Sequence, residues 1–241
     1  MKLLASVISV TEAGRLADVA ALVDVKNPAR GPLGAPDPAL VREIRRALGP
    51  SAPLSAALGD LVPDRMETVE LARQMAEAGA THVKAGLARV SFDQARATLR
   101  MVKNALDPRV AVIAAAYGDA EELGLFPPGQ LPELALEAGI DGVMVDTCRK
   151  DGRSLFDHQK PETVGEIISR ARALGLQTAL AGALGEAHLP SLGELSPDWA
   201  GFRTALTANG DRAREGVDRM RALALSGMLA AARATASARR A

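Results

Sequence analysis

Three lysines lie where lysine chemistry would be useful. Lys26, Lys84 and Lys150 fall at the ends of short apolar segments or in the loops after them, whereas arginine supplies most of the other basic side chains. A neutral lysine amine can attack an aldehyde to form a Schiff base, which a guanidinium cannot do because it does not lose its proton. Burial and neighbouring positive charge both lower a lysine pKa. The three lysines therefore indicate imine chemistry, with solvated loop lysines as the alternative.

Two aspartates lie in apolar segments close to these lysines. Asp24 precedes Lys26 by two residues, and Asp146 ends another apolar run. Side chains alternate along a strand, so Asp24 and Lys26 point to one face while Val23 and Val25 point to the other. A buried charge is costly unless it is paired. We expect Asp24 and Asp146 to be catalytic carboxylates that exchange protons with substrate or with the lysines.

The elements that must position these groups follow one repeated pattern. A helical segment ends in Gly, which supplies a left-handed residue at low cost, and a Val-, Ile- or Ala-rich run follows. Regular alternation of this kind predicts a parallel sheet with right-handed crossovers. The predicted strands are 3–10, 20–26, 53–59, 81–86, 109–117, 141–147, 176–182 and 199–203. The predicted helices are 11–18, 38–48, 65–78, 91–105, 129–138, 161–174, 186–194 and 214–236.

The repeat number and the length of 241 residues favour a single-domain α/β protein with the (βα)8 TIM-barrel fold. A doubly wound open sheet is the alternative, although no Gly-x-Gly-x-x-Gly sequence follows the first strand. We predict a catalytic barrel over 1–230 and an Ala- and Arg-rich tail over 231–241, as the frayed end of the last helix. The active site of such a barrel lies at the carboxyl ends of the strands.

Further polar or small residues at these strand ends are expected to bind substrate. TIM barrels often bind phosphate in the loops after strands 7 and 8, through backbone N–H groups. The segment 209–212 continues the second of these loops, and Tyr117 either donates a hydrogen bond to substrate or packs. The residues predicted to contact substrate or phosphate are Asn27, Asp60, Gly182, Ala183, Arg203 and Thr204.

The composition argues against several other classes of protein. The 29 basic and 29 acidic residues give zero formal charge, and aromatic residues make up 2%, so neither nucleic acid nor a membrane surface is an expected partner. Cys148 is the one cysteine and the histidines lack metal-ligand spacing, so we expect no metal and a reducing, cytoplasmic location. Self-association as a homo-oligomer remains open, because Ala-rich outer helices pack closely.

Several motifs in this order resemble one known family. They are VDVKNP (23–28), GPLGA (31–35), HVKAG (82–86), VDTCRKDGRSLFD (145–157), LAGAL (180–184) and GFRTA (201–205). Over roughly 1–225 the chain is similar to the (5-formylfuran-3-yl)methyl phosphate synthases, also called 4-(hydroxymethyl)-2-furancarboxaldehyde-phosphate synthases. The DVKNP motif and the segment 146–157 are the most specific parts of this resemblance.

The resemblance implies a (βα)8 fold and a lyase that condenses two glyceraldehyde 3-phosphate molecules into a furan aldehyde phosphate, with release of phosphate and water. The product is a precursor of methanofuran-type one-carbon carriers. The resemblance makes Lys26 the Schiff-base lysine and adds Lys84, Asp146 and Lys150 to the catalytic groups. It implies no cofactor beyond the covalent lysine imine.

Two other functions fit the residues. A Schiff-base aldolase that acts on sugar phosphates would use the same lysines but would not form a furan. A non-catalytic barrel that binds a phosphorylated ligand would form no covalent adduct. The inward-facing charges of Asp24 and Lys26 count against this second alternative, because they would cost stability without a catalytic return.

Overall fold

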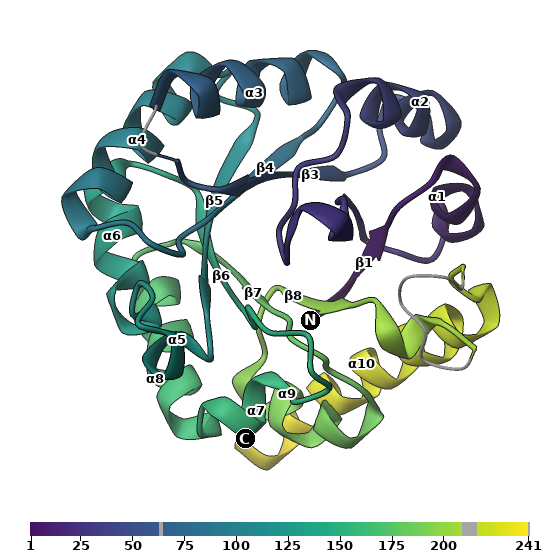
Figure 1. Ribbon diagram of the computed structural model, residues 1–241. Helices are drawn as coiled ribbons and strands as arrows, with labels where there is room; N and C mark the ends of the chain where they lie inside the picture. Colours follow the sequence, from purple (N-terminus) through teal and green to yellow (C-terminus); the bar gives the residue numbers. More distant parts are fainter. Residues whose placement is uncertain (63–64, 209–215, 241) are drawn as a thin grey trace.

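The computed structural model describes residues 1–62, 65–208 and 216–240. Eight parallel strands pair in chain order, and β8 pairs with β1 to close a barrel inside a ring of helices (Figure 1). The protein is therefore a single-domain (βα)8 TIM barrel, and the open doubly wound sheet is excluded. The strands are β1 Lys2–Val7, β2 Leu22–Val25, β3 Leu54–Asp60, β4 His82–Gly86, β5 Ala111–Tyr117, β6 Gly142–Asp146, β7 Gln177–Leu180 and β8 Trp199–Phe202.

The longer helices surround the barrel, and the short ones lie in the loops that connect strands to helices (Figure 1). The α-helices are α1 Val10–Leu16, α2 Pro38–Leu48, α3 Arg65–Glu77, α4 Phe92–Ala105, α5 Ala120–Leu123, α6 Leu131–Ala138, α7 Leu155–His158, α8 Pro161–Ala173, α9 Leu189–Leu195 and α10 Arg219–Arg240. Short 3-10 helices are η1 Pro28–Arg30, η2 Pro128–Gln130, η3 Glu186–His188 and η4 Thr204–Leu206.

Each strand is buried on both faces, as parallel strands between helices and a barrel interior must be. One apolar cluster joins the outward residues of the strands, Val23 and Val25 among them, to the helices. A smaller cluster fills the interior and includes Ile113, Met144 and Ala179. The predicted alternation around Asp24 is confirmed, because its two valine neighbours pack outward while its carboxylate pairs inside the barrel.

Element boundaries differ from the sequence predictions at several loops. The predicted strand 3–10 is too long, because Ser9 accepts a hydrogen bond from the Glu12 N–H and begins α1. The short helices α5 and α7, in the loops after β5 and β6, were not predicted. The last helix continues to Arg240. The segment 209–212, expected to continue a phosphate loop, lies outside the described residues.

Glycine ends a helix as predicted. Gly139 ends α6 in the left-handed region at φ 70°, where its N–H reaches the carbonyl of Ala135. Glycine adopts this conformation without the steric cost that a Cβ imposes, and β6 then begins within a few residues. In the part of the chain that the structure describes, no helix is both long and apolar enough to cross a membrane.

Candidate active site

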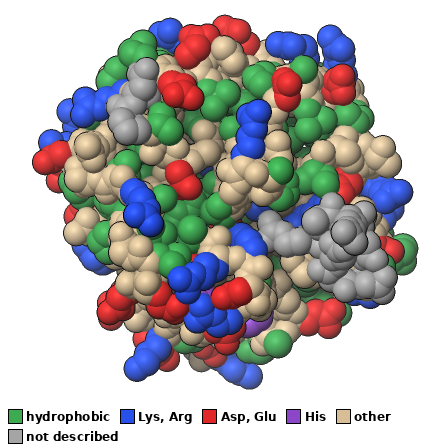
Figure 2. All heavy atoms as spheres, viewed as in Figure 1, with side chains coloured by type: hydrophobic (Ala, Val, Ile, Leu, Met, Phe, Trp, Pro, Cys, Tyr) green, Lys and Arg blue, Asp and Glu red, His purple; other side chains and the backbone are tan. Residues whose placement is uncertain are grey.

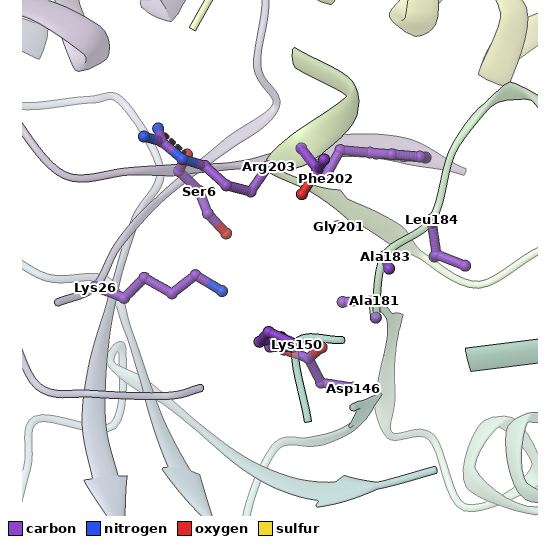
Figure 3. Close-up of a pocket in the computed structure, with 12 residues that line it drawn as sticks. Ser6, Lys26, Asp146, Lys150, Ala181, Ala183, Leu184, Gly201, Phe202 and Arg203 are labelled. Atoms are coloured by element: carbon purple, nitrogen blue, oxygen red, sulfur yellow. Dashed lines mark hydrogen bonds and ion pairs between the residues drawn. The ribbon is translucent and has the colours of Figure 1, made fainter. Parts of the chain in front are cut away.

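A pocket opens at the carboxyl ends of the strands, and Lys26 extends its amine into it (Figure 3). The pocket combines charged groups with small residues and loop backbone. Asp146 and Lys150 lie across from the Lys26 amine, and Ser6 and Arg203 form another side (Figure 3). The lining residues are Ser6, Lys26, Asp146, Lys150, Ala181, Gly182, Ala183, Leu184, Gly201, Phe202, Arg203 and Thr204.

Lys26 has the electrostatic setting of a reactive amine. It follows directly after β2 and is 6% exposed, and its side-chain amine makes no hydrogen bond or ion pair with the described residues. Burial lowers the pKa of Lys26 to about 8; the charges of Asp146 and Asp24 oppose this shift, while Lys150 and Lys84 add to it. About a tenth of the amine is therefore neutral at pH 7, far more than for an ordinary lysine, and imine formation requires this neutral form.

Asp146, at the end of β6, is held between two lysines. Its Oδ1 accepts hydrogen bonds from the Lys150 ammonium at 2.8 Å and from the Thr147 N–H at 2.7 Å. Burial alone would raise the pKa of Asp146, but the charges of Lys150 and Lys26 and these hydrogen bonds outweigh it and lower the pKa. Its Oδ2 is buried without a hydrogen-bond partner among the described residues. Asp146 is thus an ionised carboxylate, and one of its oxygens has no hydrogen-bond partner among the described residues.

A second ion pair lies deeper in the barrel. Lys84 Nζ is 2.7 Å from Asp24 Oδ1, and both side chains are almost fully buried. Ser6 Oγ donates to the other Asp24 oxygen at 3.2 Å. Asp24 precedes Lys26 by two residues on the inward face of its strand, so this pair lies below the reactive amine. Neither residue lines the pocket itself, and the pair is a charge-balanced one beneath the residues that do.

The loop after β7 brings backbone close to the pocket. Gly182 has φ +105°, and a Cβ at this position would lie 2.8 Å from the Thr147 side chain. Ala183 next to it has φ 45°, a conformation that costs energy for a residue with a side chain. Strain of this kind is often found at binding sites. The loop can therefore present backbone groups to an anion beside Lys150, as predicted for phosphate.

Arg203 lines the same pocket, and its guanidinium forms an ion pair with a buried carboxylate. Its guanidinium donates to both carboxylate oxygens of Glu12, at 2.5 and 3.0 Å, and to the Ser6 carbonyl. Glu12 also accepts the N–H of Ile8. Sequence reasoning did not identify Glu12, because nothing in the sequence brings α1 and the end of β8 together. Thr204 begins η4 on the same rim.

Two predicted substrate residues lie outside this pocket. Asn27 uses its side-chain oxygen to accept the Ala29 N–H and so caps η1. Asp60 instead accepts a hydrogen bond from Tyr117 at the end of β5. The structure thus brings most of the predicted substrate-binding residues together in one pocket. Asn27 and Asp60 do not line it, and each makes its side-chain hydrogen bond elsewhere.

Asp119 is a further buried residue that the sequence did not single out for a role. Its carboxylate accepts the N–H groups of Cys148 and Arg149 at 2.7 and 2.8 Å. These contacts hold the loop after β6 in which Lys150 lies. A carboxylate that caps a distant loop leaves no recognisable spacing, so only the folded structure reveals it.

Metal binding has no geometric support in the described part of the chain, where no three histidine, cysteine or acidic side chains gather in a way that could hold an ion. Acidic and basic side chains are interspersed on the face viewed in Figure 2, in keeping with the zero net charge.

Solved structures share the fold. The structure of 3-hexulose-6-phosphate synthase matches with a TM-score of 0.62 at 15% identity, covering 96% of this chain and 99% of that one. Phosphoribosyl anthranilate isomerase from Thermus thermophilus matches with a TM-score of 0.61 at 19% identity, with the same coverage. Fold and site together define a TIM-barrel protein with a buried cluster of lysines and carboxylates at the carboxyl ends of its strands.

Sequence relatives define the family. The 4-HFC-P synthase family profile matches residues 3–226. The (5-formylfuran-3-yl)methyl phosphate synthase of Methanocaldococcus jannaschii is 39% identical over 226 residues, covering 91% of this chain and 95% of the relative. The protein of the same name from Archaeoglobus fulgidus is 41% identical over 220 residues, covering 88% and 92%. The chain belongs to the 4-HFC-P synthase family, as its motifs had indicated.

Proposed function

We propose that this protein is a (5-formylfuran-3-yl)methyl phosphate synthase that condenses two molecules of glyceraldehyde 3-phosphate through a Schiff base on Lys26. The observation that carries this proposal is the Lys26 amine, buried in the pocket with a lowered pKa and facing Asp146 and Lys150. Family membership supports the product, since the relatives carry this name. The reaction would serve the synthesis of a methanofuran-type carrier.

The proposed reaction begins with attack of neutral Lys26 Nζ on the aldehyde carbon, and loss of water gives the imine. A carboxylate then removes a proton from the carbon next to the imine, giving an enamine from which phosphate leaves. Carbon–carbon bond formation with the second triose, ring closure and loss of water complete the furan, and hydrolysis frees Lys26. The two trioses are thus converted to one furan aldehyde phosphate, one phosphate and two waters.

We assign each residue a step of this reaction from its position relative to Lys26. Asp146 has an oxygen without a hydrogen-bond partner among the described residues and is the group proposed to take up protons. Lys150 would hold phosphate and return a proton, together with backbone of the loop at Gly182 and Ala183. Asp24 and Lys84 are buried below Lys26, and we assign them the control of its charge and orientation. No cofactor is required by this scheme.

The test is to trap and observe the reaction in one sample. The protein is incubated with glyceraldehyde 3-phosphate and borohydride, and the intact mass and the modified residue are determined. A parallel sample without borohydride is followed for the ultraviolet band of a furan aldehyde. We expect a triose-derived adduct on Lys26 and growth of the band, and neither in Lys26→Ala.

The other outcomes discriminate between functions. An adduct on Lys26 without the ultraviolet band would contradict the synthase and support a Schiff-base aldolase. A folded protein that gives neither adduct nor band would contradict Schiff-base chemistry on this substrate. Lys103→Met is a suitable control, because Lys103 is paired with Asp141 outside the pocket.

A further inference from the structure

The carboxyl end of β3 contains an extra residue. Ala57 pairs with Lys84 of β4, and the next pair is Asp60 with Gly86, so three residues of β3 match two of β4. Leu58 packs in the outer apolar core, and strict alternation would therefore turn residue 60 outward as well. The bulge instead brings the Asp60 carboxylate over the inner side of the barrel. Bulges near active sites commonly redirect a side chain in this way.

Two glycines make this arrangement feasible. Gly59 takes φ +83° inside the bulge, a conformation that favours glycine. A Cβ on Gly86 would lie 2.1 Å from Asp60 Oδ1 and 2.8 Å from the Tyr117 hydroxyl. The two side chains can meet above β4 only because residue 86 has no side chain. β3, β4 and β5 lie next to one another in the barrel wall (Figure 1).

The two groups form a short hydrogen bond. Tyr117 Oη donates to Asp60 Oδ1 at 2.5 Å. Burial raises the pKa of the Tyr117 hydroxyl, and the negative charges of Asp60 and Asp146 raise it further, so Tyr117 remains a neutral donor. Tyr117 is fully buried, whereas Asp60 is partly exposed. The pair therefore presents its carboxylate, and not its ring, to the mouth of the barrel.

An apolar side chain covers the same region. Leu33, in the loop after β2, is 1% exposed and packs in the interior cluster that contains Tyr117. Its carbonyl accepts the N–H of Gly59 at 3.0 Å, which joins this loop to the bulge. Hydrogen bonds to a charged group gain strength where water is excluded. Asp60 and Tyr117 do not line the Lys26 pocket, but the partly exposed Asp60 carboxylate lies at the same end of the barrel, beside apolar side chains.

We propose that the Asp60–Tyr117 pair holds the second triose phosphate through a hydrogen bond that Asp60 accepts from a triose hydroxyl, while the first triose is bound to Lys26. This assignment rests on the proposed function, which requires two trioses in the site at once. The pair takes no covalent part in it. Asp60 accepts a substrate hydroxyl proton in a hydrogen bond, and Tyr117 fixes the orientation of the carboxylate.

The test separates capture of the first triose from use of the second. Asp60→Asn and Tyr117→Phe, in the full-length protein, are incubated with glyceraldehyde 3-phosphate as above. We expect the borohydride-trapped Lys26 adduct to form at the rate of the unaltered protein. We expect furan formation to fall at least about tenfold, with a higher triose concentration needed for half-maximal rate, because the hydrogen bond from the triose hydroxyl to Asp60 is weakened in one variant and misaligned in the other.

Gly86→Ala tests the pair without removing either group. The added Cβ would lie 2.1 Å from Asp60 Oδ1 and 2.8 Å from the Tyr117 hydroxyl, so both groups must move, and the same loss of furan formation is expected. Gly129→Ala is the matched control, since a Cβ there meets nothing within 4 Å. Asp93→Asn is the control for Asp60→Asn, because Asp93 is an exposed partner of Arg96. Thermal unfolding of each variant shows that it is folded.

Two results would overturn the assignment. Folded Asp60→Asn and Tyr117→Phe variants that form the furan at the original rate would show that the pair does not bind substrate. Parallel loss of adduct and furan would place the pair in the first step instead. Failure of the proposed function gives a different signature, because the unaltered protein would then form no adduct or no furan.

Discussion

The environment of Lys26 distinguishes it from an ordinary surface lysine. Lys103 pairs with Asp141 on the outside of the barrel, with its Nζ 2.7 Å from a carboxylate oxygen. Lys26 is buried among groups of both signs and has no direct ion pair with the described residues. Desolvation of the ammonium is then the dominant effect, and the neutral amine becomes accessible at a lower pH.

The pH dependence of the reaction should follow this amine. Only neutral Lys26 attacks the aldehyde, and its pKa is lowered to about 8, so the neutral form increases as pH rises toward that value. We expect kcat/KM to rise about tenfold per pH unit below about 8 and to level off above it. Measurement of kcat/KM across this range checks the prediction. A rise that continues to about pH 10, where an unperturbed lysine titrates, would contradict it.

Replacement of Lys150 should shift that profile upward. The charge of Lys150 lowers the pKa of Lys26, and its ammonium occupies one oxygen of Asp146. Lys150→Met removes both effects, so the pKa of Lys26 should rise by up to about one unit and the plateau should begin at higher pH. The same pH series measures it, with Lys103→Met as control. An unchanged midpoint would show that Lys150 does not influence the amine.

At the level of elements, the site depends on contacts between segments far apart in the chain. Arg203 after β8 and Glu12 in α1 form a buried pair, with side chains 5% exposed each. Asp119 after β5 holds the loop after β6. These contacts determine where the strand-end loops lie, and thus where Lys150 and the Gly182 loop face Lys26.

Loss of Arg203 should destabilise the fold. Arg203→Met leaves the Glu12 carboxylate buried without this guanidinium, which costs about 3–5 kcal/mol in comparable buried pairs. Chemical denaturation would measure the free energy of unfolding. The double variant Glu12→Gln/Arg203→Met should recover part of the loss, because position 12 then holds no buried carboxylate. A change below about 0.5 kcal/mol, typical of surface substitutions, would contradict the role of the pair.

At the scale of the whole molecule, closure of the barrel assembles the pocket. β8 pairs with β1 through the register Leu4 with Gly201 and Ala5 with Phe202, which brings the first and last strands of the barrel together. The pocket takes residues from both sides of this closure, from β6, and from the loops after β2 and β7. A ligand that bridges these strands should therefore stabilise the entire fold.

Inorganic phosphate should act as such a ligand. At ten times its dissociation constant, a ligand of the native state stabilises it by about 1.4 kcal/mol. For a chain of this size this corresponds to a rise in Tm of about 3–6 °C. Thermal unfolding at increasing phosphate and constant ionic strength measures it, with sulfate and chloride as comparisons. We expect a smaller shift for Lys150→Met. Equal shifts in both proteins would place the bound phosphate elsewhere.

The sequence determined the fold to a large extent. Alternating apolar runs and glycine-terminated helices predicted the (βα)8 barrel, because each pattern reflects local backbone geometry and burial. The inward direction of Asp24 also followed from alternation, and it is confirmed by its pair with Lys84. Position at the strand ends predicted most of the residues that line the pocket, since parallel strands bring all their carboxyl ends to one face. The catalytic roles of these residues remain predictions.

Only the tertiary structure decided the partners of these residues. Alternation would turn residue 60 outward, but a bulge of one residue reverses it and joins Asp60 to Tyr117. Arg203 was predicted from its strand end, yet its contact with Glu12 arises from barrel closure across most of the chain. Local sequence fixes the strand on which a side chain lies. Register, bulges and closure of the sheet determine which groups meet, because they depend on packing among all eight strands.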